Sequence, residues 1–270
     1  MEQIILTNDD GFDAVPLWEL AHALEKYAKV GVIAPKEHKS WGAKAITASG
    51  KKVRCEKKSI DGLDMIVADG NPADCTLLGI GHYFPKANLV VSGMNIGSNA
   101  GHYSAFGSGT VGAAIEAALH GIFGVAVSSD IDIETFRAVT KGGMGVEKQR
   151  ELFAPQAKLA AGFIRTLDRE KIAQLTKLGI WVLNINVPQE VEEKTPWEIT
   201  SYSEIDYGYL FKRTGEDEFE YGGCHHQTER LGKETDFDNV ADGKMSVTPL
   251  KLRTDYDDLD AVRAILKPKK

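Results

Sequence analysis

The sequence has few of the features that mark several large classes of protein. It has only three cysteines in 270 residues. They are an odd number at wide spacing, which fits neither a disulfide framework nor a zinc knuckle and is typical of a reducing compartment. No apolar run is long enough to span a membrane, and the run at residues 4–6 is too short for a secretory signal. We therefore expect a cytoplasmic protein.

The chain also lacks an excess of basic residues. Its 32 Lys and Arg against 39 Asp and Glu give a net charge of -7, and its pI is about 5.6. Binding to a nucleic-acid backbone needs a surplus of Lys and Arg, so we expect no nucleic-acid polymer as a partner. What remains is a globular chain with 43% hydrophobic content, long enough for one large domain or one domain with an appendage.

Short apolar runs alternate with helical patterns through the first two-thirds of the chain. This alternation is typical of parallel strands joined by crossover helices, and right-handed crossovers would make a Rossmann-like, doubly wound α/β sheet. The expected strands are bulky and apolar, as strands buried on both faces are. They cover residues 4–7, 30–34, 65–68, 89–92, 125–128 and 181–186, with helices between them that include residues 109–121 and 156–167.

Two segments break this alternation. Residues 130–150 contain Lys-Gly-Gly-Met-Gly and are predicted to be a flexible loop or insertion. Residues 196–257 are rich in aromatic and β-branched residues, a texture that predicts hairpins, including one at residues 245–248. Isolated hairpins are marginally stable, so we expect an arm that pairs between subunits. The expected organisation is a core of residues 1–195, a β-hairpin oligomerisation arm of 196–257, and a C-terminal helix and tail of 258–270.

Two adjacent carboxylates, Asp9 and Asp10, directly follow the first apolar run. In an open α/β sheet the carboxyl ends of the strands share one edge, and ligands bind there. Adjacent carboxylates repel each other unless a cation lies between them or one is protonated. The alternative is that one of them caps the next helix or forms a turn with Gly11. The doublet after a buried strand favours a hard divalent ion such as Mg²⁺, Mn²⁺ or Ca²⁺.

A glycine-spaced loop at residues 92–101 carries two asparagines and is followed by Gly-Ser-Gly-Thr at residues 107–110. Glycines let the backbone approach an anion closely, and the free amides at a helix amino terminus attract phosphate. The pattern therefore predicts a phosphate-binding loop. It also fits a pair of tight turns with a serine cap, and the residues alone leave both interpretations open. The loop lacks the Walker lysine and the dinucleotide spacing.

Several other residues have candidate roles. The Cys-His-His run at residues 224–226 has no further Cys or His at ligand spacing, which argues against a metal site there. His102 lies in the loop region and is a candidate acid. Lys39 could steer an anion, although most such lysines are only solvated.

Five short motifs occur in a fixed order along the chain. They lie at residues 7–11 (TNDDG), 32–40 (VIAPKEHKS), 70–75 (GNPADC), 92–99 (SGMNIGSN) and 108–114 (SGTVGAA), with further similarity at 184–188 and 246–250. In these motifs the chain resembles the SurE family, the survival-protein E nucleotidases. The resemblance spans nearly the whole chain. It implies a metal-dependent 5′-nucleotidase that acts on nucleoside monophosphates, with a Rossmann-like core and a hairpin arm that builds homodimers or homotetramers.

The resemblance also implies roles for individual residues. One divalent ion per subunit, Mg²⁺ or Mn²⁺, would be held by Asp9, Asp10, Ser40 and Asn95. Asp9 and Asp10 would be catalytic as well. The phosphate would be faced by Asn99, Ser108, Gly109 and Thr110. Chemistry alone does not point to Ser40, because a neutral hydroxyl is a weak ligand. The attacking group stays open between water and a carboxylate of the doublet. With a nucleotide as substrate, Tyr103 and Phe106 are candidates to stack on the base.

The chain departs from the family pattern at places that border the pocket. Asn71 stands where the family usually has threonine, residues 100–107 are a residue longer and less acidic than usual, and residues 141–150 are unfamiliar. These departures bear on substrate preference more than on reaction type. The alternatives are a haloacid-dehalogenase-type phosphatase, a metal-dependent deacetylase, or a non-catalytic nucleotide-binding stress module. Against the first two, the chain has no Asp-x-Asp-x-Thr pattern and no His-Pro before the doublet.

Overall fold

The computed structural model describes residues 3–192, 194–204, 208–222 and 234–252. The predicted tail at 258–270 and the run at 224–226 lie outside these residues. The elements are, in order, β1 (Gln3–Thr7), α1 (Val15–Glu25), β2 (Lys29–Pro35), β3 (Cys55–Ile60), β4 (Leu63–Ala68), α2 (Pro72–Leu78), η1 (Gly79–Tyr83), β5 (Leu89–Ile96), α3 (His102–Gly107), α4 (Gly109–Leu119), β6 (Phe123–Ser129), α5 (Ile133–Thr140), α6 (Val146–Arg165), α7 (Arg169–Lys177), β7 (Ile180–Val187), β8 (Trp197–Ile199), β9 (Phe211–Arg213), β10 (Phe219–Tyr221), α8 (Asp236–Ala241) and β11 (Met245–Lys251).

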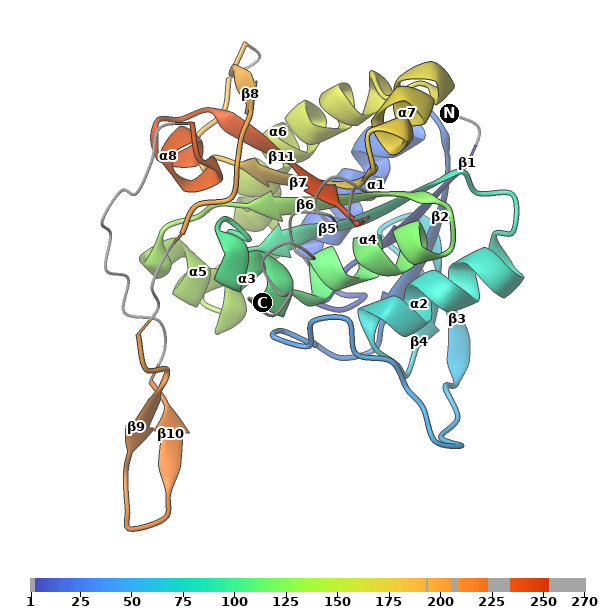
Figure 1. Cartoon of the computed structure of the whole chain (residues 1–270). Coiled ribbons are helices and arrows are strands. Elements are labelled where there is room, and N and C mark those ends of the chain that lie inside the picture. The colour runs from blue at the N-terminus through green and yellow to red at the C-terminus, as the bar shows by residue number, and fades with distance from the viewer. Residues whose placement is uncertain (1–2, 193, 205–207, 223–233, 253–270) are drawn as a thin grey trace, which may run out of the picture.

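A mostly parallel sheet forms the centre of the molecule (Figure 1). In the described part of the chain its strand order is β3-β4-β2-β1-β5-β6-β7-β11-β8, and the run from β4 to β7 is parallel throughout. The chain moves outward from β1 through β2 to β4, then returns to the other side of β1 at β5. This is the doubly wound order of the Rossmann fold, with its switch point between β1 and β5. The predicted fold class is confirmed.

Helices cover both faces of the sheet. Figure 1 shows α2 and α4 on one face, with α1 and α6 on the other. In α1, Leu17, Leu20 and Leu24 recur at three- and four-residue spacing, and all three are fully buried, as the apolar stripe of a helix against a sheet should be. On the other face α4 lies very close to β6, because a Cβ at Gly124 would come within 2.3 Å of the carbonyl oxygen of Ala114.

Antiparallel pairs occur near both edges of the sheet. β3 pairs with β4 at one edge, and β11 pairs with β7 near the other, followed by β8. The prediction of a hairpin at residues 245–248 is therefore wrong, because these residues belong to a buried strand of the main sheet. Alternating β-branched residues fit both a hairpin and a strand near the edge of a mixed sheet. Pattern alone did not separate the two.

The segment at residues 130–150 is helical, so the prediction of a flexible loop or insertion there is wrong. The carboxylate of Asp132 caps α5 by accepting hydrogen bonds from the amides of Glu134 and Thr135, both at 2.9 Å, as an N-cap residue does. α6 already begins at Val146. Only the short turn between the two helices carries the glycines that signalled a loop.

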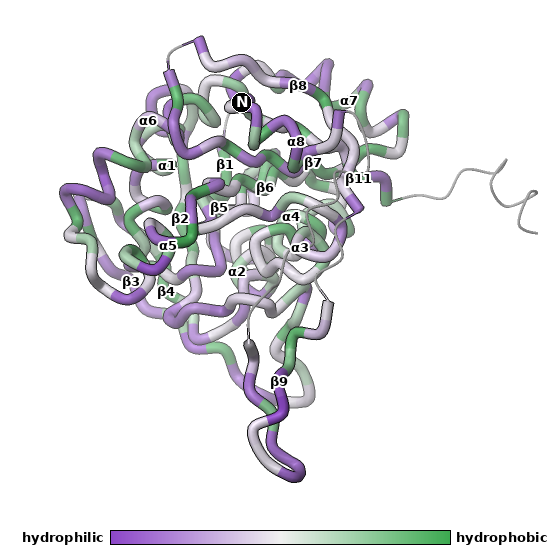
Figure 2. The backbone as a smooth tube through the Cα atoms, turned by 90° about the vertical axis from the view of Figure 1, so that its left-hand side faces the viewer, coloured by the Kyte–Doolittle hydropathy of each residue, from purple (hydrophilic) through white to green (hydrophobic). Residues whose placement is uncertain are grey.

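The hairpin of β9 and β10 stands away from the body of the molecule (Figures 1 and 2). Its two strands pair antiparallel, with Phe219 opposite Arg213, and all their residues are exposed. The confirmed hairpin is thus shorter than the predicted arm, since β8 and β11 of that arm join the main sheet. Within the described residues we find no helix of sufficient length and hydrophobicity to cross a membrane.

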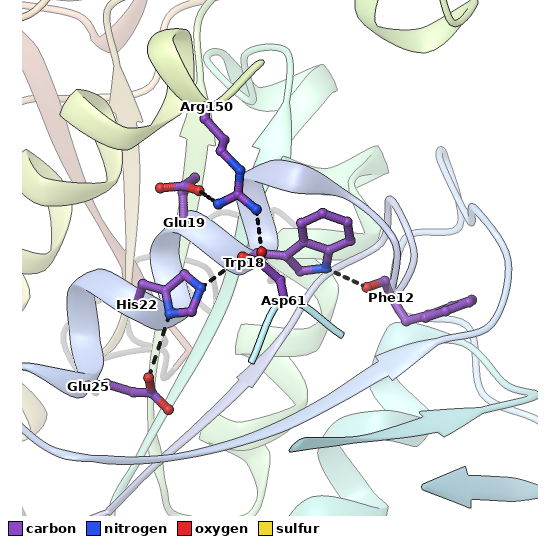
Figure 3. A network of polar contacts seen from close by, with 7 residues as sticks. All are labelled: Phe12, Trp18, Glu19, His22, Glu25, Asp61 and Arg150. Atoms are coloured by element: carbon purple, nitrogen blue, oxygen red, sulfur yellow. Dashed lines mark hydrogen bonds and ion pairs between the residues drawn. The ribbon is translucent and has the colours of Figure 1, made fainter. Parts of the chain in front are cut away.

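A network of charged side chains fastens the start of α6 to α1 and to the turn between β3 and β4 (Figure 3). Arg150 donates to Glu19 at 2.6 Å and also pairs with Asp61. The imidazole of His22 lies 2.9 Å from the other oxygen of Asp61. The hydrogen bond from Arg150 is the largest cause that holds the pKa of Asp61 below its ordinary value. The carboxylates of Glu19 and Asp61 thus form an acidic cluster whose counter-ion, Arg150, is supplied by the fold itself.

Candidate active site

The loops that follow β1, β2 and β5 meet at the switch point of the sheet. β1 ends at Thr7 and delivers Asp9 and Asp10, while β5 itself runs on to Ile96. A cavity of about 160 Å³ opens there. It is lined by Asp9, Ser40, Trp41, Asn95, Ile96, Gly97, Ser98, Asn99, Ser104, Ser108 and Phe136. The structure therefore brings together most of the residues that the sequence singled out, at the edge where ligands bind in such sheets.

Asp9 is fixed in place by its neighbours on three sides. Its side chain is buried, with 3% of the residue exposed, and its Oδ1 accepts a hydrogen bond from the hydroxyl of Thr110 at 2.6 Å. Its carbonyl oxygen accepts from the amide of Lys39 at 2.7 Å. Helix α4 begins directly against it, since a Cβ at Gly109 would come within 2.9 Å of Oδ2. Gly109 and Thr110 thus position a carboxylate as well as open a helix.

Asp10 faces the other two loops. Its Oδ2 accepts from the amide of Ile96 at 2.9 Å, and its Oδ1 lies 3.3 Å from Nε2 of His38. The same nitrogen lies 2.8 Å from the hydroxyl of Ser40. His38 therefore links Asp10 to Ser40. The hydrogen bond with Asp10 raises the pKa of His38.

The electrostatics of the doublet are unfavourable without a cation. Burial raises the pKa of Asp9 to about 7, and the negative charge of Asp10 adds to the rise, while the hydroxyl of Thr110 opposes it. Within the described residues, no Lys or Arg forms an ion pair with either carboxylate. Removing two like charges from water without a counter-ion is costly, and a divalent cation would relieve that cost.

The side chains present fit a hard cation. The side-chain N–H of Asn95 donates to the carbonyl oxygen of Gly97 at 2.7 Å. This orientation leaves the side-chain oxygen of Asn95 available to a cation. In the part of the chain that the structure describes, no three histidine, cysteine, aspartate or glutamate side chains are grouped to hold a metal. An ion at the doublet would therefore take its remaining ligands from neutral oxygens, as Mg²⁺ and Mn²⁺ accept. Asp9, Asp10, Ser40 and Asn95 offer such a set.

The expected phosphate side of the cavity is rigidly held. The amide of Asn99 donates to the side-chain oxygen of Asn186 at 2.8 Å, and Asn184 donates to the carbonyl of Asn99 at 2.9 Å. The side chain of Asn99 donates to Ser128 at 2.8 Å. Ser108 caps α4 by accepting from the amide of Val111 at 3.2 Å. The helix amino terminus and Asn99 thus meet at one cavity, where an anion can be received.

Asn184, Asn186 and Ser128 were not predicted as site residues. They sit on buried strands β7 and β6, and hold the loop from behind. Their signal in the sequence is a polar residue inside an apolar strand, because a buried amide needs a partner. The asparagines at 184 and 186 interrupt Trp-Val-Leu-Asn-Ile-Asn-Val in that way.

Other candidates lie outside the cavity. His102 packs on Tyr202, with ring centroids 5.1 Å apart, and on Phe106 at 6.0 Å. Neither His102 nor Phe106 lines the cavity. Tyr103 reaches it only indirectly, by packing against Trp41. Lys39 pairs with Glu37 at 3.3 Å.

Fold and site together define a class: an open α/β protein whose sheet carries, at its switch point, a helix terminus suited to an anion and a carboxylate pair without a Lys or Arg partner among the described residues. Comparison with known proteins narrows this class. The family description "Survival protein SurE" matches residues 4–208. The chain belongs to the SurE family.

Relatives of known name match over nearly their whole length. The chain is 34% identical over 277 residues to "5'-nucleotidase SurE" of Helicobacter pylori (strain Shi470), covering 96% of each chain. It is 32% identical over 270 residues to the protein of the same name from Aliarcobacter butzleri (strain RM4018), covering 96% of this chain and 97% of the relative. A crystal structure of SurE protein from Aquifex aeolicus superimposes with a TM-score of 0.73 at 24% identity, covering 98% of this chain and all of that one, which supports the fold.

Proposed function

We propose that this chain is a divalent-metal-dependent phosphomonoesterase that hydrolyses nucleoside 5′-monophosphates to nucleosides and phosphate. One observation carries the proposal: within the described residues neither Asp9 nor Asp10 has a Lys or Arg partner, and buried Asp9 lines the same cavity as Ser108, which caps a helix amino terminus suited to phosphate. The relatives named 5'-nucleotidase SurE, similar over nearly the full length, favour a nucleotide as the phosphate donor.

The residues divide into two groups by what they would hold. Asp9, Asp10, Ser40 and Asn95 would hold one Mg²⁺ or Mn²⁺ ion. When bound, that ion supplies positive charge that polarises a phosphoryl oxygen. Asn99 and the Ser108-Gly109-Thr110 turn orient the phosphoryl group and stabilise negative charge on it through fixed amides. Thr110 has a second task, because its hydroxyl fixes Asp9.

The alternatives are disfavoured by the family assignment. A haloacid-dehalogenase-type phosphatase and a metal-dependent deacetylase use different motifs around their carboxylates, whereas this chain belongs to the SurE family. A non-catalytic nucleotide-binding module would bind nucleotide without releasing phosphate. Only an assay of product distinguishes that last case.

The test is phosphate release from AMP with Mg²⁺, with Mn²⁺ and with a chelator. We expect turnover with at least one ion and loss on chelation. Asn95→Ala should lower turnover strongly at equal metal concentration. Asn88→Ala is the matched control, because Asn88 directly precedes β5 at the opposite end from Asn95, and it should keep wild-type activity. Turnover that survives both chelation and Asn95→Ala contradicts the proposal.

We extend the proposal to the assembly and location of the enzyme. The hairpin exposes Phe211, Phe219 and Tyr221, each roughly half exposed or more, and exposed aromatic clusters mark interaction surfaces. This supports a homodimer or homotetramer built through the hairpin. Replacing Phe211 and Phe219 with serine should then lower the mass measured by light scattering. Cys55 and Cys75 are free thiols, which supports the cytoplasm as the compartment.

A further inference from the structure

Two aromatic side chains line the cavity beside its polar residues. They are Trp41, which directly follows Ser40, and Phe136 of α5. The residues predicted from the sequence to stack on a base are Tyr103 and Phe106, and neither of these lines the cavity. The aromatic surface that a substrate can reach therefore comes from different residues.

Trp41 is held in a specific position. Its backbone has φ of +57°, a left-handed conformation that a bulky residue rarely adopts. Its ring lies on Gly107, where a Cβ would come within 2.7 Å of the indole. The ring of Tyr103 packs against it, with centroids 5.6 Å apart. The amide of Ala43 donates to the carbonyl oxygen of Gly107 at 3.0 Å and ties the same loop down.

Phe136 reaches the cavity from a different segment, and a glycine seats it as well. A Cβ at Gly97 would lie 3.4 Å from its ring. Each aromatic ring thus rests on a glycine of the polypeptide that surrounds the expected phosphate position. Trp41 nevertheless remains 47% exposed. An indole with so much exposed surface is not serving as core, since a core indole is mostly buried, so much of its surface is available to a ligand.

We infer that Trp41, together with Phe136, forms the nucleobase subsite and determines selectivity for nucleotides over other phosphate monoesters. The inference rests on the proposed function, which places the phosphoryl group at the polar residues. The cavity of about 160 Å³ is smaller than the pockets of roughly 300 Å³ or more that enclose whole ligands. The rest of a nucleotide must extend past the aromatic rings, and an aromatic base gains stacking there that a sugar phosphate cannot gain.

The test compares AMP with ribose 5-phosphate, which carry the same phosphorylated sugar and differ by the base. Trp41→Gly, chosen because glycine accepts the positive φ, should lower kcat/KM for AMP about tenfold, mainly through KM. It should change kcat/KM for ribose 5-phosphate less than about twofold. Trp41→Phe should restore most of the loss. UMP should lose less than AMP, because its ring is smaller.

The matched control is Trp197→Ala. Trp197 is 49% exposed, almost as much as Trp41, but it lies on β8 and packs against Phe163. This variant should leave both substrates unchanged. Phe136→Leu should act in the same direction as Trp41→Gly with a smaller effect. Thermal unfolding of each variant shows whether it is folded.

A binding measurement needs neither metal nor turnover. Adenosine, which has no phosphate, should quench the tryptophan emission of the wild-type protein and of Trp197→Ala, but not that of Trp41→Phe. Equal loss of kcat/KM for AMP and ribose 5-phosphate in Trp41→Gly overturns the inference and leaves the proposed function standing. Adenosine quenching that persists in Trp41→Phe overturns the inference too. Absence of phosphate release from any monoester by the wild type instead refutes the proposed function.

Discussion

Two acidic clusters in this molecule have opposite electrostatics. In the first, Arg150 joins Glu19 and Asp61, and the pKa of Asp61 is lowered, chiefly by the hydrogen bond from Arg150. In the second, Asp9 and Asp10 lie side by side in the sequence, and burial together with the charge of Asp10 raises the pKa of Asp9 to about 7. Both clusters join segments that are distant in the sequence. The first is neutralised by Arg150. In the second, no Lys or Arg of the described residues pairs with either carboxylate, and His38 pairs with Asp10 but leaves Asp9 without an ion pair.

The difference distinguishes charge that stabilises the fold from charge that the proposed function requires. A self-neutralised cluster has its partners supplied by the fold, so it contributes to stability and offers nothing to a ligand. A cluster that the fold leaves without a Lys or Arg partner costs stability, which a bound cation would restore. Such local conflicts are expected at functional sites. The contrast yields four predictions.

The largest effect concerns activity. Asp9→Asn should lower phosphate release from AMP by about a thousandfold, because it removes one of the two charges that would hold the ion. Asp61→Asn is the same chemical change in the self-neutralised cluster and should keep wild-type turnover per folded molecule. Initial rates at saturating Mg²⁺ or Mn²⁺ measure both. Equal activity of the two variants would remove the distinction between the clusters.

The second effect is a gain in stability. In the absence of metal, Asp9→Asn should be more stable than the wild type at pH 8. The raised pKa means that the folded carboxyl keeps a proton which the unfolded one releases near 3.8, so wild-type stability falls as pH rises from about 4 to about 7. Asparagine does not titrate. Each pKa unit corresponds to about 1.4 kcal/mol, which makes the gain at most about 4 kcal/mol.

Urea unfolding with chelator present at pH 8 and at pH 4.5 measures this gain. It should be largest at pH 8 and small at pH 4.5, where the native carboxyl is protonated in the wild type. Added Mn²⁺ should reverse the order, since only the wild type binds it tightly. A variant that is less stable than the wild type at both pH values would show that the doublet is not strained.

The sequence predicted the fold well where periodicity and length agreed. The apolar runs that became β1, β2 and β6 are buried on both faces and flanked by clear helical patterns, so strand and crossover followed from the residues. The helix α5 was missed because five glycine-rich residues beside it dominated its interpretation. β11 was missed because its partner β7 lies about sixty residues earlier in the chain, and pairing at that distance leaves no local signal.

At the site, the sequence indicated Asp9 and Asp10 by chemistry, whereas Ser40 came only from the family resemblance. A neutral oxygen carries no signal until the fold places it beside a charge. For a related reason, the sequence did not predict that Trp41 and Phe136 line the cavity. Whether an aromatic side chain packs in a core or lines a cavity depends on its contacts with residues that are distant in the sequence. Here Trp41 rests against Gly107, and Phe136 rests against Gly97.

The third effect tests the self-neutralised cluster directly. Arg150→Met keeps much of the side chain's apolar contact but removes the charge shared by Glu19 and Asp61, which are mostly buried at their side chains. Losing one partner of such a network leaves carboxylates uncompensated, and we expect a cost of about 2 kcal/mol in urea unfolding. Arg137→Met, on the exposed side of α5, should cost less than about 0.5 kcal/mol. Equal costs would show that the network adds nothing.

The smallest effect follows from the pKa of Asp61, and its sign is opposite to that of Asp9. Asp61→Asn should destabilise the protein by about 1 kcal/mol at pH 7, because asparagine keeps the hydrogen-bonding shape and loses the charge. Asparagine also tolerates the positive φ of 54° at this position. A lowered folded pKa gives stability that is present above the unfolded value of 3.8 and is lost as pH falls through the folded one. The two proteins should therefore converge in acid, and a gap that stays constant down to pH 3 would assign the cost to the turn and not to the charge.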